Sequence, residues 1–182
     1  MTTALLVMDF QNGLVGRIPG AEALLGTVSS AIEKVRADGG HVGWVRVGFT
    51  DDEFDAIPST SVMARMAGSV VRASMHADAD STQFHEKLTP QPDDIVVRKT
   101  RIGSFTTTDL DEHLTNRGVT SLVLAGISTS GVVLSTAREA MDRDYAITVL
   151  SDACADPDPA THEFLVGTLY PRYGRVITTA EL

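Results

Sequence analysis

The sequence has one cysteine, few aromatic residues and no long hydrophobic run, and each scarcity narrows the classes of protein it can be. Cys154 is the only cysteine in 182 residues, so the chain cannot form an internal disulfide. A lone thiol suits a reducing compartment, and we therefore expect a cytoplasmic protein. No stretch reaches the roughly 20 apolar residues that span a bilayer, and the first residues lack the pattern of a signal peptide. Aromatic residues make up 5% of the chain, which indicates an aliphatic core.

Positive charge is also scarce. The chain has 15 basic and 24 acidic residues, a formal net charge of −9, and the basic residues form no cluster. This balance argues against nucleic acid or an anionic membrane as a partner. The five histidines are scattered without an HxH or HExxH array, so we expect no metal site and no cofactor.

The composition that remains is typical of a globular protein, with 43% hydrophobic and 21% charged residues. We expect a single domain over residues 1–182. Apolar runs alternate with helical patterns, which predicts an α/β fold with a parallel sheet and helices on both faces, in three layers. Residues 50–92 are irregular and are expected to cover a site or meet a partner subunit. The predicted strands are residues 4–8, 41–49, 95–97, 121–125, 147–150 and 176–177, and the predicted helices are residues 20–37, 109–116, 130–142 and 159–169.

Polar or glycine residues directly follow several of these strands. Asp9, Lys99, Gly126 and Asp152 each come where an apolar run ends. In a parallel sheet the carboxyl ends of the strands form the ligand crevice. We therefore predict a site where Asp9, Lys99 and the turn of residues 126–132 converge.

Two interpretations of Asp9 and Lys99 are open from the residues alone. A partly buried acid beside an ammonium group can be tuned to donate or accept a proton. Alternatively, Asp9 caps the turn that follows it, and Lys99 is a solvated surface cation like its neighbours Arg98 and Arg101.

Four stretches of the chain resemble the isochorismatase-like hydrolase superfamily. They are LLVMDFQNGLV, LTPQPDDIVVRKTRIGSF, LVLAGISTSGVVLSTAREA and YAITVLSDACAD, in this order over nearly the whole chain. The resemblance implies a six-stranded, Rossmann-like parallel sheet and a hydrolase of a small molecule. It also implies that Asp9 is the acid/base carboxylate, with Lys99 as its charged partner. Finally, it implies a cis Ile127–Ser128 peptide and an oxyanion hole made by the backbone amides of Ser128 and Val132.

The sequence departs from this family at the nucleophile. Amidase members carry a cysteine where this chain has Val132, and valine cannot attack a carbonyl. Isochorismatases proper also lack that cysteine, and there the carboxylate protonates a vinyl ether while water adds. The tyrosine and histidine of their turn are here Ser128 and Ser130, so the bond cleaved, vinyl ether or C–N, is not transferred. Ser130 and Ser135 are weak candidates for a nucleophile, because the predicted helix points them away from Asp9.

Further residues have two interpretations each. Gln11, Phe105 and Ile127 are expected to contact the substrate, with a turn hydrogen bond as the alternative for Gln11 and core packing for Phe105. Trp44 and Cys154 are expected to pack in the core. We predict a homo-oligomer, a dimer or tetramer, because Met63, Met66 and residues 70–71 lack an obvious core partner.

Three functions therefore follow as hypotheses. The first is a cofactor-free hydrolase of a small polar metabolite that acts without a cysteine nucleophile. The second is a degenerate family member that binds a small ligand or a partner without turnover. The third is a tailoring enzyme for a specialised metabolite.

Overall fold

The computed structural model describes residues 2–66 and 69–182 of the chain, apart from the side chains of residues 65–70. Its centre is a six-stranded parallel sheet in the order β3-β2-β1-β4-β5-β6. The strands are β1 (Thr2–Met8), β2 (His41–Val47), β3 (Ile95–Lys99), β4 (Val119–Ile127), β5 (Ala146–Ala155) and β6 (Arg175–Ile177). The α-helices are α1 (Asn12–Val15), α2 (Ala21–Ala37), α3 (Asp51–Asp55), α4 (Ser69–Ser74), α5 (Leu110–Asn116), α6 (Leu134–Met141) and α7 (Pro159–Phe164).

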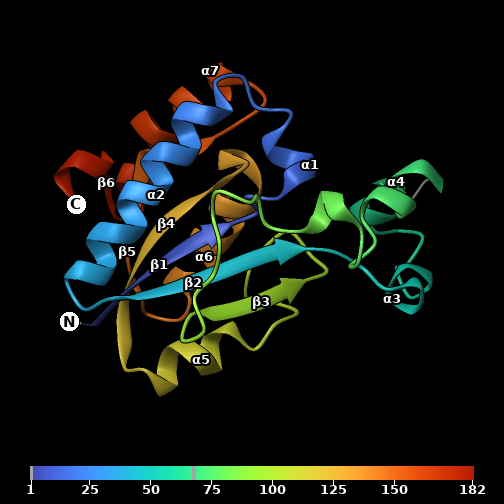
Figure 1. The fold of residues 1–182 in the computed structure, drawn as a ribbon, viewed down its shortest axis with the longest axis horizontal. Helices are drawn as coiled ribbons and strands as arrows, with labels where there is room; N and C mark the ends of the chain where they lie inside the picture. The colour runs from blue at the N-terminus through green and yellow to red at the C-terminus, as the bar shows by residue number, and fades with distance from the viewer. Residues whose placement is uncertain (1, 67–68) are drawn as a thin grey trace.

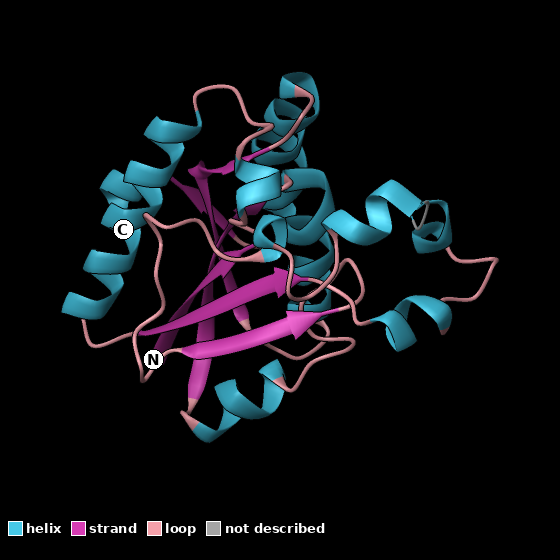
Figure 2. Ribbon diagram, turned by 45° about the vertical axis from the view of Figure 1, so that its right-hand side comes forward, coloured by secondary structure: helices cyan, strands magenta, loops and turns pink. Residues whose placement is uncertain are grey.

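Helices cover both faces of the sheet and make three layers, as predicted (Figures 1 and 2). Side chains alternate between the faces of a strand, so Leu5 and Val7 of β1 pack with α2, while Leu6 and Met8 pack with α5 and α6. The sheet is therefore buried on both sides, which explains the continuous apolar runs of its strands. Among the described residues, every helix is too short or too polar to cross a lipid bilayer.

Several predicted boundaries are wrong: Lys99 and Gly126 belong to β3 and β4 instead of following them, and two further differences lie in the last third of the chain. Strand β5 runs to Ala155, so Asp152 lies inside the strand instead of after it. The predicted helix over residues 159–169 is divided into α7 and a π-helical turn at Leu165–Leu169. Periodicity reports which side chains are buried, and it does not show where hydrogen bonding changes from one pattern to another.

Residues 50–83 form a region that we call the arm, made of short helices that project beyond the carboxyl ends of β2 and β3 (Figure 1). Met63 of the arm is buried against Phe49 and Phe54, so the expectation that it lacks a core partner is wrong. Met66 and Val70, which were part of the same expectation, lie outside the described side chains. Val71 is partly buried at the wall of a cavity described below.

Candidate active site

The strand order places the candidate site at a reversal of the sheet. The chain builds outward from β1 through β2 to β3, then returns to the other side of β1 and continues through β4, β5 and β6. In open parallel sheets, ligands bind at the carboxyl ends of the strands where the order reverses. Asp9 follows β1 and Ser128 follows β4, so both residues stand at this point.

Asp9 and Lys99 form a buried ion pair at the carboxyl edge of the sheet. Lys99 Nζ lies 2.9 Å from Asp9 Oδ2, and the two side chains are 3% and 7% exposed. Lys99 is the last residue of β3 and reaches Asp9 past the end of β2, which separates β3 from β1. The lysine also donates a hydrogen bond to the backbone carbonyl of Arg101 at 3.2 Å. The predicted proximity is confirmed, and the alternative of a solvated surface cation is wrong for Lys99.

The electrostatics of Asp9 suit a group that exchanges a proton. Burial raises the pKa of Asp9, while the charge and hydrogen bond of Lys99 lower it in part. Within the described part of the chain, Asp9 Oδ1 is buried and has no hydrogen-bond partner. Burying a polar atom without a partner costs free energy. The described residues therefore satisfy only one of the two carboxylate oxygens of Asp9.

The end of β4 packs tightly against β1 and against the turn that follows it. A Cβ atom on Gly126 would lie 2.9 Å from Val133 Cγ2 and 3.2 Å from Met8 Cβ, so this position has room only for glycine. The peptide between Ile127 and Ser128 is cis. A π-helical turn over Thr129–Val133 then leads into α6.

The turn over Thr129–Val133 is held by side chains from residues 156–170. Tyr170 Oη donates to the carbonyl of Thr129 at 2.6 Å, and Thr129 Oγ1 lies 2.8 Å from His162 Nδ1. The backbone amide of Ser130 donates to Asp156 Oδ2 at 2.7 Å. Thr129 is fully buried, so its contact with His162 holds the turn and does not present a nucleophile to a ligand.

A cavity of about 480 Å³ opens over the ion pair and the turn. Six of the predicted site residues line it together: Asp9, Gln11, Lys99, Ile127, Ser128 and Val132. Most of the remaining wall is apolar and comes from α1, the loop after it, β2, the arm and the loops after β3 and β5. Its apolar members are Leu14, Ile18, Val47, Met63, Val71, Met75, Ile102 and Pro157. Two arginines, Arg17 and Arg101, complete the charged part of the lining.

Gln11 lines the cavity, but its side chain is used to join parts of the protein. Its Nε2 donates to the carbonyls of Val47 at 2.7 Å and Thr82 at 2.8 Å, and its Oε1 accepts from the amide of Val47 at 2.9 Å. Both amide hydrogens and the oxygen are therefore engaged. These contacts favour a structural hydrogen-bonding role for Gln11 over contact with a substrate. Its partners lie in β2 and the arm, whereas the sequence alternative placed them in its own turn.

Phe105 is a core residue, and the expectation that it contacts substrate is wrong. Its ring is buried, lies 6.1 Å from the ring of Tyr145, and has the guanidinium of Arg143 4.7 Å from its centre. The backbone amide of Phe105 donates to Glu139 Oε2 at 3.0 Å. This bond ties the loop after β3 to α6, which explains why the ring packs beneath the site and outside the cavity lining.

Three other residues have structural roles. Trp44 is fully buried and its Nε1 donates to Asp94 at 2.8 Å, in agreement with core packing. Cys154 is buried, and burial raises its pKa to about 12, which makes it a poor nucleophile. Asp152 accepts hydrogen bonds from the amide and hydroxyl of Thr179.

Sequence reasoning missed the arginines, whereas the expectation that residues 50–92 cover a site agrees with Met63, Val71 and Met75 of the arm in the cavity lining. Arg98 and Arg101 were both grouped with surface cations, yet Arg98 pairs with Glu53 of the arm and Arg101 lines the cavity. The signal that was present is the position of Arg101, two residues after Lys99 in the same loop. Among the described residues, no group of three or more His, Cys, Asp or Glu side chains is arranged to hold a metal ion.

A Rossmann-ordered parallel sheet with a buried carboxylate–lysine pair at its reversal defines an α/β protein with a polar candidate site at the carboxyl edge of its sheet. The family model of the isochorismatase domain matches residues 3–181. The chain therefore belongs to the isochorismatase family, whose members are hydrolases.

Known proteins resemble the chain over its whole length. It is 32% identical to the uncharacterized isochorismatase family protein YwoC of Bacillus subtilis, over 98% of this chain and 91% of that protein. It is 31% identical to the probable inactive nicotinamidase At3g16190 of Arabidopsis thaliana, over 88% and 84%.

Solved structures agree with this result. An isochorismatase family protein from Burkholderia thailandensis superposes with a TM-score of 0.85 at 31% identity, covering 100% of this chain and 93% of that one. The N-carbamoylsarcosine amidase of Thermoplasma acidophilum superposes with a TM-score of 0.79 at 30% identity, covering 100% and 99%.

Proposed function

We propose that this isochorismatase-family hydrolase acts on a small polar metabolite by acid–base chemistry of Asp9, with water as the attacking group. The observation that carries the proposal is that the two oxygens of the buried Asp9 carboxyl have different surroundings. Lys99 holds Oδ2, while Oδ1 has no partner among the described residues and belongs to a side chain that lines the cavity. A carboxyl held in this way can transfer a proton at Oδ1 while its charge state is set through Oδ2.

The same arrangement serves either bond that the family resemblance suggests. For a vinyl ether, Asp9 protonates the terminal carbon, water adds to the cationic carbon next to oxygen, and a proton of that water returns to Asp9. The resulting hemiketal then breaks its ether C–O bond: the hydroxyl proton passes to the departing alcohol oxygen, and a carbonyl compound remains. For a C–N bond, Asp9 accepts a proton from the attacking water and passes it to the leaving nitrogen. In the second case we assign the backbone amides of Ser128 and Val132 to the developing oxyanion.

The lack of a thiol at the turn is the reason for assigning the attack to water. Val132 lines the cavity at the place that the family resemblance gives to cysteine, and Cys154 is buried with a raised pKa. Valine has no nucleophilic atom, and burial together with a raised pKa disfavours the thiolate of Cys154.

The test is a panel of vinyl ethers, amides and ureides given to the purified protein. We expect Asp9→Asn and Lys99→Ala to lower kcat/KM by about 100-fold or more, the range of general acid–base effects. Asp152→Asn is the matched control, because it makes the same chemical change outside the cavity lining. Rates that stay unchanged in the Asp9 and Lys99 variants would refute the assignment.

A second function, ligand binding without turnover, is favoured by Val132 and by the relative that is itself called a probable inactive nicotinamidase. Val132→Cys separates the two candidates. A gain of amidase activity from zero would indicate a silent scaffold, whereas damage to an existing activity would support catalysis without a thiol.

Assembly and location stay predictions. The case for a homo-oligomer now depends less on Met63, which is packed, and more on its neighbour Val62, which is 60% exposed. Size-exclusion chromatography with light scattering tests it. The cytoplasmic location continues to depend on the lone cysteine.

A further inference from the structure

The cavity is positively charged although the protein is acidic. Its described lining holds one carboxylate, Asp9, and three cations, Arg17, Lys99 and Arg101. The ion pair cancels the charges of Asp9 and Lys99, so the two arginines remain as an excess in a chain whose net charge is −9. A cleft with the opposite sign to its protein attracts ligands of the other charge.

Arg101 is the better placed of the two arginines. Its backbone carbonyl accepts the hydrogen bond of Lys99 at 3.2 Å, which fixes the residue next to the ion pair. Its side chain is partly buried and donates through Nη1 to the carbonyl of Thr100 at 2.7 Å. A guanidinium has five N–H donors, so this single bond leaves most of the group for a ligand.

The comparison with Arg98, three residues earlier, shows what Arg101 lacks. Arg98 is held by both carboxylate oxygens of Glu53, at 2.6 and 3.1 Å. Within the described residues, neither Arg101 nor Arg17 has a carboxylate within ion-pair distance. A planar guanidinium of this kind matches a carboxylate in two parallel hydrogen bonds.

The rest of the wall limits what can carry that anionic group. Met63, Met75 and Ile102 belong to an apolar lining that surrounds the charged residues. A highly charged polyanion would leave this surface facing its hydration shell, whereas a short hydrocarbon body would bury it.

We infer that the substrate is a small carboxylate with a short apolar body, and that Arg101, assisted by Arg17 at the exposed mouth, binds the carboxylate. This inference rests on the proposed function only in calling the bound molecule a substrate. The anion site itself is a statement about binding, and it can be tested without turnover.

The first measurement is calorimetric titration of the purified protein with hexanoate, hexanamide and inorganic phosphate. We expect hexanoate to bind about tenfold or more tightly than hexanamide, which has the same body without the charge, because charge-assisted hydrogen bonds are of that strength. Equal binding of hexanoate and hexanamide would overturn the inference. Tighter binding of phosphate than of hexanoate would also overturn it, because the site would then select charge without an apolar body.

The second measurement assigns the residue. We expect Arg101→Gln to weaken hexanoate binding about tenfold or more and to leave hexanamide within about twofold. Arg101→Lys, which keeps the charge and loses the fork, should fall between the two. Arg17→Gln should have a smaller effect that fades with added salt, because this side chain is exposed.

Arg172→Gln is the matched control, since it removes an exposed arginine outside the cavity lining and should change no affinity. Circular dichroism confirms the fold of each variant. Unchanged hexanoate binding by folded Arg101→Gln would refute the role of Arg101.

The two proposals fail separately. Discrimination of hexanoate with no activity on any substrate would leave the anion site intact and remove the proposed function. Turnover of carboxylate substrates with KM and kcat unaffected by Arg101→Gln would leave the proposed function and remove the anion site.

Discussion

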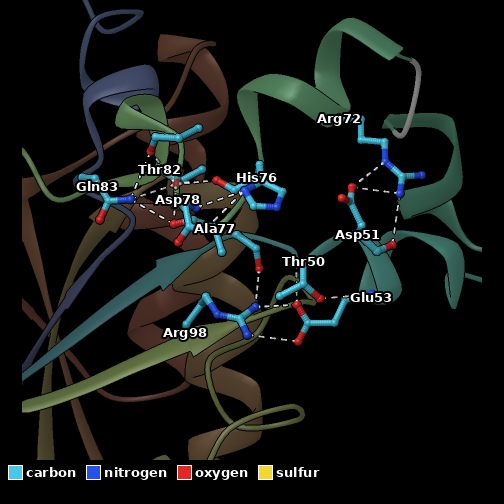
Figure 3. A network of polar contacts seen from close by, with 12 residues as sticks. Thr50, Asp51, Glu53, Arg72, His76, Ala77, Asp78, Thr82, Gln83 and Arg98 are labelled. Carbon is cyan, nitrogen blue, oxygen red and sulfur yellow. Dashed lines mark hydrogen bonds and ion pairs between the residues drawn. The ribbon is translucent and has the colours of Figure 1, made fainter.

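The carboxyl edge of the sheet and the arm line the same cavity, but they are held in place by different means. The edge carries the ion pair of Asp9 and Lys99, whose side chains are 7% and 3% exposed at the ends of core strands. The arm is attached by Arg98 to Glu53, 30% and 35% exposed, and braced internally by Arg72 to Asp51, 36% and 73% exposed (Figure 3). Salt and water screen exposed pairs and hardly reach buried ones.

This difference separates two requirements of a site. Proton transfer needs groups held within tenths of an ångström, and the buried edge provides that rigidity. The shape of the cavity depends on Met63, Val71 and Met75 from the arm, whose ion pairs are partly exposed. The comparison predicts that breaking the ion pair of the edge has a large effect on stability, and that breaking an ion pair of the arm has a small one.

The largest effect is expected from Lys99→Met. It leaves the buried carboxyl of Asp9 without its counter-charge, and breaking a buried pair costs about 3–5 kcal/mol. The free energy of unfolding from urea denaturation measures this. The double variant Asp9→Leu/Lys99→Met should recover most of the loss, because no charge is then left buried. If Lys99→Met cost as little free energy of unfolding as the loss of the Arg98–Glu53 pair in the arm, the comparison between edge and arm would fail.

The pH dependence of stability should follow Asp9. Its pKa in the folded protein is raised by burial, so its contribution to stability is full below the unfolded pKa near 3.8 and is lost as pH rises through the folded pKa. Lys99→Met removes the lowering effect of the ammonium on the pKa of Asp9, so the loss of stability should occur at higher pH. The contribution of Asp9 is measured as the difference in free energy of unfolding, from urea denaturation, between each protein and its Asp9→Asn counterpart. If Lys99→Met moved the loss of this contribution to lower pH, the prediction would be contradicted.

A smaller effect is expected from Gly126→Ala. Its new Cβ would press on Val133 and Met8, and overpacking of this kind costs about 1–3 kcal/mol. Gly26→Ala, in the interior of α2 with nothing within 4 Å of the new atom, is the control and should stabilise by up to about 1 kcal/mol. Thermal unfolding measures the Tm of both variants. Equal shifts in Tm would show that this part of the chain does not depend on the close approach of Gly126 to Val133 and Met8.

The smallest effect is expected in the arm from Glu53→Gln. Glutamine can keep the capping box that Glu53 makes with Thr50 at the start of α3, so the variant removes mainly the charge that faces Arg98. Because both partners are about a third exposed, the cost should stay below about 1 kcal/mol. If the change in KM, expressed as a free energy, exceeds the change in the free energy of unfolding, the arm shapes the cavity. A loss of stability equal to that of Lys99→Met would refute the contrast between the arm and the edge.

The sequence by itself determined the layers, the edge that carries the site and the family. Alternating apolar runs and helical patterns require a parallel sheet, and parallel strands end at one edge, so Asp9 and Lys99 were predictable as neighbours although 90 positions separate them. Tertiary structure alone decided which polar side chain meets which partner. Gln11 binds Val47 and Thr82, Phe105 turns out to be core, and Arg101 lines the cavity while Arg98 pairs with Glu53. The physical reason is that periodicity records how deeply a residue is buried, whereas hydrogen bonds and ion pairs depend on segments brought together only by the completed fold.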